Sequence, residues 1–135
     1  MFAFVTLGSN DLNKSSKFYD KVLKPLGIVK AITNKRYIGY AKKDNLMLID
    51  QGKSEFIEFY LIYPFNKKKA TNGNGTMIAL MAKSRDQVDK FHEVAIKLGV
   101  LNEGSPGQRR ADSKNYYAYI RDISGNKICV HTKSL

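Results

Sequence analysis

Two stretches of the sequence share one plan: residues 4–28 are FVTLGSNDLNKSSKFYDKVLKPLGI, and residues 77–100 are MIALMAKSRDQVDKFHEVAIKLGV. At an offset of 73 residues, the sequence KFYD at positions 17–20 matches KFHE at positions 90–93. Each stretch begins with an apolar segment, continues with an amphipathic helical pattern and then reaches a glycine, a common helix end. We therefore predict that the chain contains two copies of one strand–helix–strand unit.

The spacing of apolar residues predicts two helices, one over residues 12–26 and one over residues 84–99. Asn10 or Asp11 is expected to cap the first helix, and Ser84 opens the second in a capping-box pattern. Four lysines lie on the face opposite to the apolar residues of the first helix: Lys14, Lys17, Lys21 and Lys24. We expect that face to be solvated rather than to bind phosphate.

The segments between and after the helices have the β-branched and aromatic composition of strands. We expect strands over residues 29–33, 36–42, 46–50, 55–63, 116–121 and 127–132, with a hairpin turn at residues 34–35 and a turn at 122–126. Residues 103–115 are expected to form a long loop, of the kind that often carries function. The domain organisation that follows is one domain, residues 1–135, with module one at about 1–65, a linker at about 66–75 and module two at about 76–135.

The composition is that of an ordinary globular chain and excludes several kinds of site. Cys129 is the only cysteine, which excludes an intrachain disulfide and a zinc site built from several thiolates. The longest apolar stretch, residues 56–65, is too short to span a bilayer. The N-terminal sequence lacks the pattern of a secretory signal. We therefore expect a cytoplasmic protein without membrane association.

The formal net charge of +11 permits a nucleic-acid surface, an anionic ligand or simple solubility. Of the 23 basic residues 18 are lysines, whereas arginine is the better group for two-pronged recognition of phosphate. The lysines are also spread along the chain, with one tight run at residues 67–69. The charge pattern therefore favours a solvated lysine-rich surface over a nucleic-acid interface.

Four segments, in this order, resemble the vicinal oxygen chelate superfamily of glyoxalases, bleomycin-resistance proteins and extradiol dioxygenases. They are FVTLGSNDLNKSSKFYDKVLKPLG, GTMIALMAKSRDQVDKFHEVAIKLG, the loop sequence SPGQR and the closing RDISGNKI. The resemblance implies an α+β fold of two tandem βαβββ modules, whose curved mixed sheets form a cup for a divalent metal and a substrate. Members of the superfamily commonly pair, so the resemblance also implies a homodimer.

The resemblance further implies where metal ligands would lie, on the first and last strands of each module, where relatives carry His and Glu. The matching positions here are Phe4, Tyr60, Met77 and Cys129. Phenylalanine cannot coordinate a metal, and methionine is a poor ligand for hard divalent ions. We therefore expect no cofactor and no metal at the usual site. A rebuilt divalent-metal site of Glu58, Cys129 and His131 is the disfavoured alternative.

The other candidate residues favour a small-molecule site. Arg109 matches an arginine common among close relatives and can hold a carboxylate or phosphate through two hydrogen bonds. The apolar and aromatic residues at the positions where relatives carry metal ligands would complete a typical pocket wall. The predicted ligand-binding residues are Phe4, Tyr60, Met77, Arg109, Tyr119 and Cys129. The predicted catalytic residues, if the chain is an enzyme, are His131 and Glu58 as bases.

Three functional hypotheses follow. The leading prediction is a glyoxalase-like protein that binds a small organic ligand, with an anion as one option, in the cup without the usual metal. The alternative is an active lyase, isomerase or dioxygenase of the same superfamily, because the sequence does not decide whether the chain is an enzyme. The third is nucleic-acid binding through the lysine-rich surface. Sequestration of bleomycin is disfavoured, because that ligand is cationic and the chain is basic.

Overall fold

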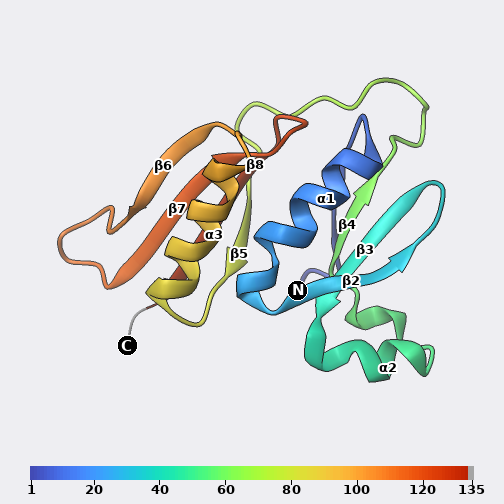
Figure 1. Cartoon of the computed structure of the whole chain (residues 1–135), viewed down its shortest axis with the longest axis horizontal. Helices are drawn as coiled ribbons and strands as arrows, with labels where there is room; N and C mark the ends of the chain where they lie inside the picture. The colour runs from blue at the N-terminus through green and yellow to red at the C-terminus, as the bar shows by residue number, and fades with distance from the viewer. Residues whose placement is uncertain (134–135) are drawn as a thin grey trace.

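Each half of the chain folds as a βαβββ unit around its own four-stranded mixed sheet (Figure 1). The computed structural model describes residues 1–133, so the last two residues of the predicted second module, 134 and 135, lie outside the described residues. The first sheet has the order β1-β4-β3-β2, and the second has the order β5-β8-β7-β6. In both, the first strand of the unit runs parallel to the last, and the other neighbours are antiparallel. The predicted repeat and α+β fold are confirmed.

The strands of the first sheet are β1 (Val5–Gly8), β2 (Ile28–Thr33), β3 (Tyr37–Lys42) and β4 (Phe59–Ile62). Those of the second are β5 (Ile78–Met81), β6 (Asn102–Gly107), β7 (Asn115–Arg121) and β8 (Lys127–Lys133). The predicted hairpin at residues 34–35 forms, and the Asn34 side chain accepts the backbone N–H groups of Arg36 and Tyr37.

The two main helices start at the predicted caps. Before α1 (Leu12–Val22), the Asp11 carboxylate accepts the N–H of Lys14 at 2.9 Å. Before α3 (Arg85–Lys97), the Ser84 hydroxyl accepts the N–H of Gln87 at 3.3 Å. Within residues 1–133, no helix combines the length and the apolar character needed to cross a membrane.

The first helix is shorter than predicted. It ends at Val22 and continues as a 3-10 turn, η1 (Lys24–Leu26), because Pro25 has no N–H group to donate to the helix. Gly27 then reverses the chain at a φ of 69°, a left-handed conformation that glycine adopts without the steric cost of a side chain.

Each helix covers one face of its own sheet, and the two helices lie side by side near the middle of the molecule (Figure 1). The apolar stripe of α1 packs on β3 and β4, and that of α3 packs on β7 and β8. The helices also contact each other, so the two units share one core. Fully buried members are Tyr19, Val22, Leu23, Leu61, Val88, Phe91, Ile120, Ile128 and Val130. His92, on the buried side of α3, bonds to the Asn102 side chain at 3.0 Å.

Of the strands predicted in the first unit, one is wrong and another is too long. Residues 46–50 form the helix α2 (Leu46–Asp50) after a 3-10 turn, η2 (Lys43–Asn45). The start of the predicted strand 55–63 lies in another 3-10 turn, η3 (Ser54–Phe56), which packs on α2 and leaves only Phe59–Ile62 in the sheet. A short apolar run such as LMLID fits a strand or a helix equally well, and here the contact with η3 decides for the helix.

The predicted long loop over residues 103–115 is also partly wrong. Its first part forms β6, an edge strand that pairs with β7 through two irregularities in register. Glycine, serine and proline are poor strand formers, which explains why composition indicated a loop here. Only residues 108–114 connect the two strands.

A buried hydrogen-bond cluster joins the two units at the turn between β7 and β8. The Tyr19 hydroxyl, from α1, donates to the Asp122 carboxylate at 2.7 Å. That carboxylate also accepts the backbone N–H groups of Ser124 and Asn126 and the Asn126 side-chain amide, each at 2.9 Å. The Asn126 amide donates in addition to the carbonyl of Gly8 in β1 at 3.0 Å. Burial, and then the negative charge of Asp122, raise the pKa of Tyr19 well above its usual value.

The connector between the units is held at one point. The side chain of Asn10 accepts the N–H of Ala70 at 2.8 Å and donates to its carbonyl at 3.1 Å. Ala70 is buried, whereas residues 71–76 that follow it are exposed.

We predict that Tyr19→Phe lowers the free energy of unfolding by about 1–3 kcal/mol, because a buried carboxylate loses one of its four donors. Urea unfolding followed by circular dichroism measures the change. Tyr37→Phe is the matched control, because its hydroxyl has no protein partner among the described hydrogen bonds. Equal destabilisation by the two substitutions would show that the cluster does not hold the units together.

Candidate functional site

The faces of the two sheets that the helices do not cover form the candidate site. Because side chains alternate along a strand, Val5 and Leu7 turn toward the core and Thr6 turns to the bare face, as does Phe4 just before the strand. The register places Tyr60 beside Thr6 in the first sheet and Cys129 beside Ala79 in the second. Thr6 and Ala79 are equivalent by the 73-residue repeat. Tyr60 and Cys129 therefore occupy matching places in the two units.

The bare face of the first sheet is aromatic and carries no charge in its hollow. The Tyr60 ring meets Phe4 edge-on with centroids 5.5 Å apart, and meets Tyr37 in the same way at 5.6 Å. With Thr6 and Ile62, these rings line a hollow of about 260 Å³. Burial is the main cause that raises the pKa of Tyr60, so its phenol stays neutral at physiological pH.

The bare face of the second sheet carries three parallel rings. Tyr119 stacks on Tyr117 with centroids 6.1 Å apart and planes 13° apart. Tyr117 stacks in turn on His131 at 5.4 Å and 20°. The buried Nδ1 atom of His131 has no hydrogen-bond partner within residues 1–133. The three rings give the bare face an aromatic surface, and the Nδ1 atom of His131 is buried at one end of it.

Two cations lie at the Tyr119 end of this stack. The Arg109 guanidinium lies 5.1 Å from the Tyr119 ring centre, and the Lys127 ammonium lies 5.8 Å from it. One Arg109 nitrogen, Nη2, donates to the carbonyls of Ser105 at 2.7 Å and Tyr117 at 3.4 Å, which holds the side chain in place. Gly104 permits this packing, because a Cβ there would lie 2.8 Å from the Tyr119 ring. The other Arg109 nitrogens, Nε and Nη1, have no carbonyl or carboxylate partner among the hydrogen bonds of residues 1–133, and their N–H groups can donate to an anion.

A hollow of about 530 Å³ lies beside the stack. The loop between β6 and β7 and the start of β7 supply its walls. The lining residues are Arg109, Arg110, Asp112, Ser113, Asn115, Tyr117 and Tyr119. Asp112 pairs with Arg110 at 3.1 Å, which leaves Arg109 as the guanidinium without a carboxylate partner in this hollow.

Cys129 lies under the Tyr119 ring and is only 1% exposed. Burial raises the pKa of its thiol from 9.0 to about 11, although the hydrogen bond with Tyr119 and the positive charge of Arg109 act in the opposite direction. A thiol with this pKa is protonated at neutral pH and is a weak nucleophile. Cys129 therefore contributes packing rather than reactivity to the face.

Within one chain, the predicted site residues fall into two groups that lie on different sheets. Phe4 and Tyr60 lie on the first sheet, with the exposed Glu58 just before β4. Arg109, Tyr119, Cys129 and His131 lie on the second sheet, and Met77 lies at its border, just before β5 and 44% exposed. The predicted ligand-binding residues left out Tyr117 and Lys127, which belong to this face. The alternation Tyr117–Tyr119 and Cys129–His131 was the available signal.

The residues at the four metal-ligand positions do not fit a divalent metal. Phe4 offers no donor, Met77 offers a soft thioether, and Tyr60 and Cys129 are neutral at physiological pH. No group of three His, Cys, Asp or Glu side chains within residues 1–133 lies close enough together to hold a metal ion. The rebuilt site considered above is not assembled within residues 1–133, where Glu58, Cys129 and His131 form no such group.

We predict that Cys129 in the folded protein reacts slowly with iodoacetamide at pH 8 and faster as the pH approaches 11, because only the thiolate reacts. Mass spectrometry of the alkylated protein measures the rate, with urea-unfolded protein as the control. The folded-state pKa lies above the ordinary value, so the thiol contributes stability that is complete below pH 9 and is lost as the pH rises through 11. Equal rates for folded and unfolded protein at pH 8 would contradict the burial of this thiol.

Comparisons with known proteins agree with this geometry. The family model described as Glyoxalase/Bleomycin resistance protein/Dioxygenase superfamily matches residues 2–130. A glyoxalase/bleomycin resistance protein from Albidiferax ferrireducens T118 is 37% identical, with 99% of each chain covered and a TM-score of 0.82. The fosfomycin resistance protein FosX from Listeria monocytogenes is 16% identical, with a TM-score of 0.64 over 98% of this chain and 92% of that chain, and shares the fold. No curated protein matches. The chain therefore belongs to the glyoxalase/bleomycin resistance protein/dioxygenase superfamily.

Proposed function

We propose that this protein binds a small organic anion with a flat apolar body on the second sheet, without a divalent metal. The observation that carries the proposal is the stack of Tyr119, Tyr117 and His131 with the held guanidinium of Arg109 at its edge. Three parallel rings provide the apolar surface, and Arg109 with Lys127 provides the positive charge that a carboxylate or phosphate needs. The four metal-ligand positions supply apolar or neutral contacts in place of coordination.

The proposal includes pairing of two copies. The bare sheet faces carry large exposed apolar side chains, with exposed fractions of 57% for Phe4 and 74% for Met81. Contiguous exposed apolar surface of this kind marks an interaction site. The hollow on the first sheet and the hollow on the second are lined by separate sets of residues. A homodimer in which the first sheet of one copy covers the second sheet of the other would enclose each ligand between an aromatic wall and a cationic wall.

Catalysis is the second candidate function, and one observation favours it. The Nδ1 atom of His131 is buried at the end of the ring stack and has no hydrogen-bond partner within the described part of the chain. An imidazole nitrogen without a hydrogen-bond partner is a candidate proton acceptor, and a ligand would have to uncover this one to reach it. Turnover of a methylglyoxal–glutathione adduct, lost in His131→Ala, would assign the enzyme function.

We predict that 1-naphthoate binds and that Arg109→Ala weakens this binding about fivefold or more, because one charge-assisted contact is lost. Isothermal titration calorimetry measures the affinity. The uncharged 1-naphthalenemethanol is expected to bind the wild type and Arg109→Ala with the same affinity.

Arg85→Ala is the matched control for this experiment. Its guanidinium stacks on Tyr116, whose hydroxyl bonds to Asp89 of α3, so it lies on the helix side of the second sheet. Equal losses in Arg109→Ala and Arg85→Ala would contradict the proposed site. Stoichiometric zinc, nickel, manganese or iron in the purified protein, bound through Cys129 and His131, would contradict the metal-free proposal.

We predict a dimer in solution that Met81→Asp converts to a monomer, because a carboxylate would be buried unpaired between two sheets. Sedimentation velocity measures the oligomeric state. Met47→Asp is the matched control, because Met47 is 71% exposed on α2, away from the bare faces. A monomeric wild type, or a dimer that survives Met81→Asp, would contradict the proposed pairing.

A further inference from the structure

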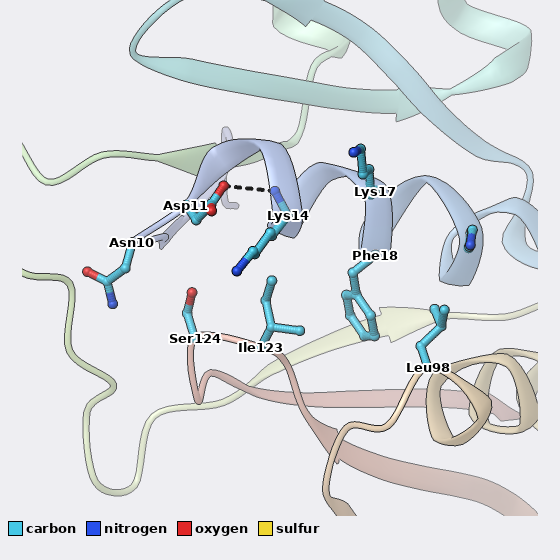
Figure 2. Close-up of a pocket in the computed structure, with 9 residues that line it drawn as sticks. Asn10, Asp11, Lys14, Lys17, Phe18, Leu98, Ile123 and Ser124 are labelled. Carbon is cyan, nitrogen blue, oxygen red and sulfur yellow. Dashed lines mark hydrogen bonds between the residues drawn. The ribbon is translucent and has the colours of Figure 1, made fainter.

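A separate groove lies between the two units, on the side of the helices rather than on the bare sheet faces (Figure 2). Its volume is about 520 Å³, within the range of small-molecule sites. Three apolar side chains from three elements form its floor: Phe18 of α1, Leu98 after α3, and Ile123 of the turn between β7 and β8. Leu98 and Ile123 are 37% and 45% exposed, so the floor is open to a ligand.

One side of the groove is cationic. Lys14, Lys17 and Lys21 line it, and within residues 1–133 none of them has a carboxylate oxygen within 4.0 Å. The acidic residue among the lining residues is Asp11, whose carboxylate accepts the N–H of Lys14 as the helix cap. The groove therefore combines an apolar floor with three lysines that form no ion pair within residues 1–133, against the single carboxylate of Asp11.

The positions of the polar groups set the direction of a ligand. Figure 2 shows Lys14 extending from α1 toward the turn that carries Ile123 and Ser124, whereas Lys17 projects from another side of the helix. The Ser124 hydroxyl has no described protein partner and can donate to an anion. The Asn10 side chain is held by two hydrogen bonds to Ala70, which orient its amide along the connector. The anionic head therefore belongs at Lys14 and Ser124.

We propose that this groove binds a medium-chain aliphatic carboxylate. Its carboxylate contacts Lys14 and Ser124, and its chain lies along Ile123, Phe18 and Leu98 (Figure 2), toward Lys21, which also lines the groove. Lys14 and Lys21 are two helical turns apart, about 10 Å along the axis, which an extended chain of about eight methylenes spans. Such a ligand would touch both units next to the Tyr19–Asp122 hydrogen bond, so its binding would favour their packed arrangement.

Decanoate below its micelle concentration is the probe for this site. We expect saturable binding by calorimetry, with amide shifts in ¹⁵N-NMR spectra centred on residues 11–21 and 123–124. Each methylene removed from the chain is expected to weaken binding about two- to fourfold, because it contacts the floor. The triple variant Lys14→Gln/Lys17→Gln/Lys21→Gln is expected to bind more than about tenfold less tightly.

The matched control carries the same change of charge elsewhere: Lys35→Gln/Lys42→Gln/Lys43→Gln, on the β2–β3 turn and at the end of β3. It is expected to bind decanoate as the wild type does. Leu98→Asn removes apolar contact at the far end of the groove, from a position that is 37% exposed, and is expected to weaken decanoate binding more than hexanoate binding. Absence of saturable binding, equal losses in the two triple variants, or binding that Arg109→Ala abolishes would each overturn the proposal. The last outcome would place decanoate on the second sheet instead.

Discussion

The arrangement of the two units depends on one buried carboxylate. Asp122 closes the turn between β7 and β8 through the backbone of Ser124 and Asn126, and it accepts the Tyr19 hydroxyl of the other unit. Burial of an unpaired carboxylate at this depth would cost free energy. The burial of Asp122 therefore depends on its four hydrogen-bond donors. Because the same turn bonds to Gly8 through Asn126, the helix and the first strand of the first unit are positioned by a loop of the second.

The same topology appears twice, yet the two bare faces differ in chemistry. The hollow of the first is lined by edge-on rings and by no charged residue, and the second presents stacked rings with two cations at the Tyr119 end. The helices account for what the faces share, because each buries one side of its sheet and leaves the other side bare. The β6–β7 loop accounts for much of the difference, because it supplies Arg109, which no residue of the first hollow matches. A repeated scaffold has thus been given one neutral and one positive surface.

The sequence predicted the parts of the fold that depend on local pattern. The helix caps at Asp11 and Ser84, the hairpin at Asn34 and the repeat of 73 residues are all visible in spacing alone. It failed where a segment takes its structure from a neighbour, as residues 46–50 do when they pack as a helix against η3. The sequence could assign site residues to the bare faces of the sheets, because side chains alternate along a strand. Its division between two separate hollows was not, because that depends on how the units pack.

The exposed connector after Ala70 has a consequence for how the protein is assembled. Residues 71–76 are exposed, whereas the units are joined by the packing of α1 on α3, by Asn126 and by the cluster at Asp122. The covalent link raises the local concentration of one unit around the other, but it does not determine which residues form the interface between them. A chain cut between residues 71 and 76 would leave two fragments that each retain a complete sheet and helix. The molecule can accordingly be regarded as a complex of two complementary fragments that are made in tandem.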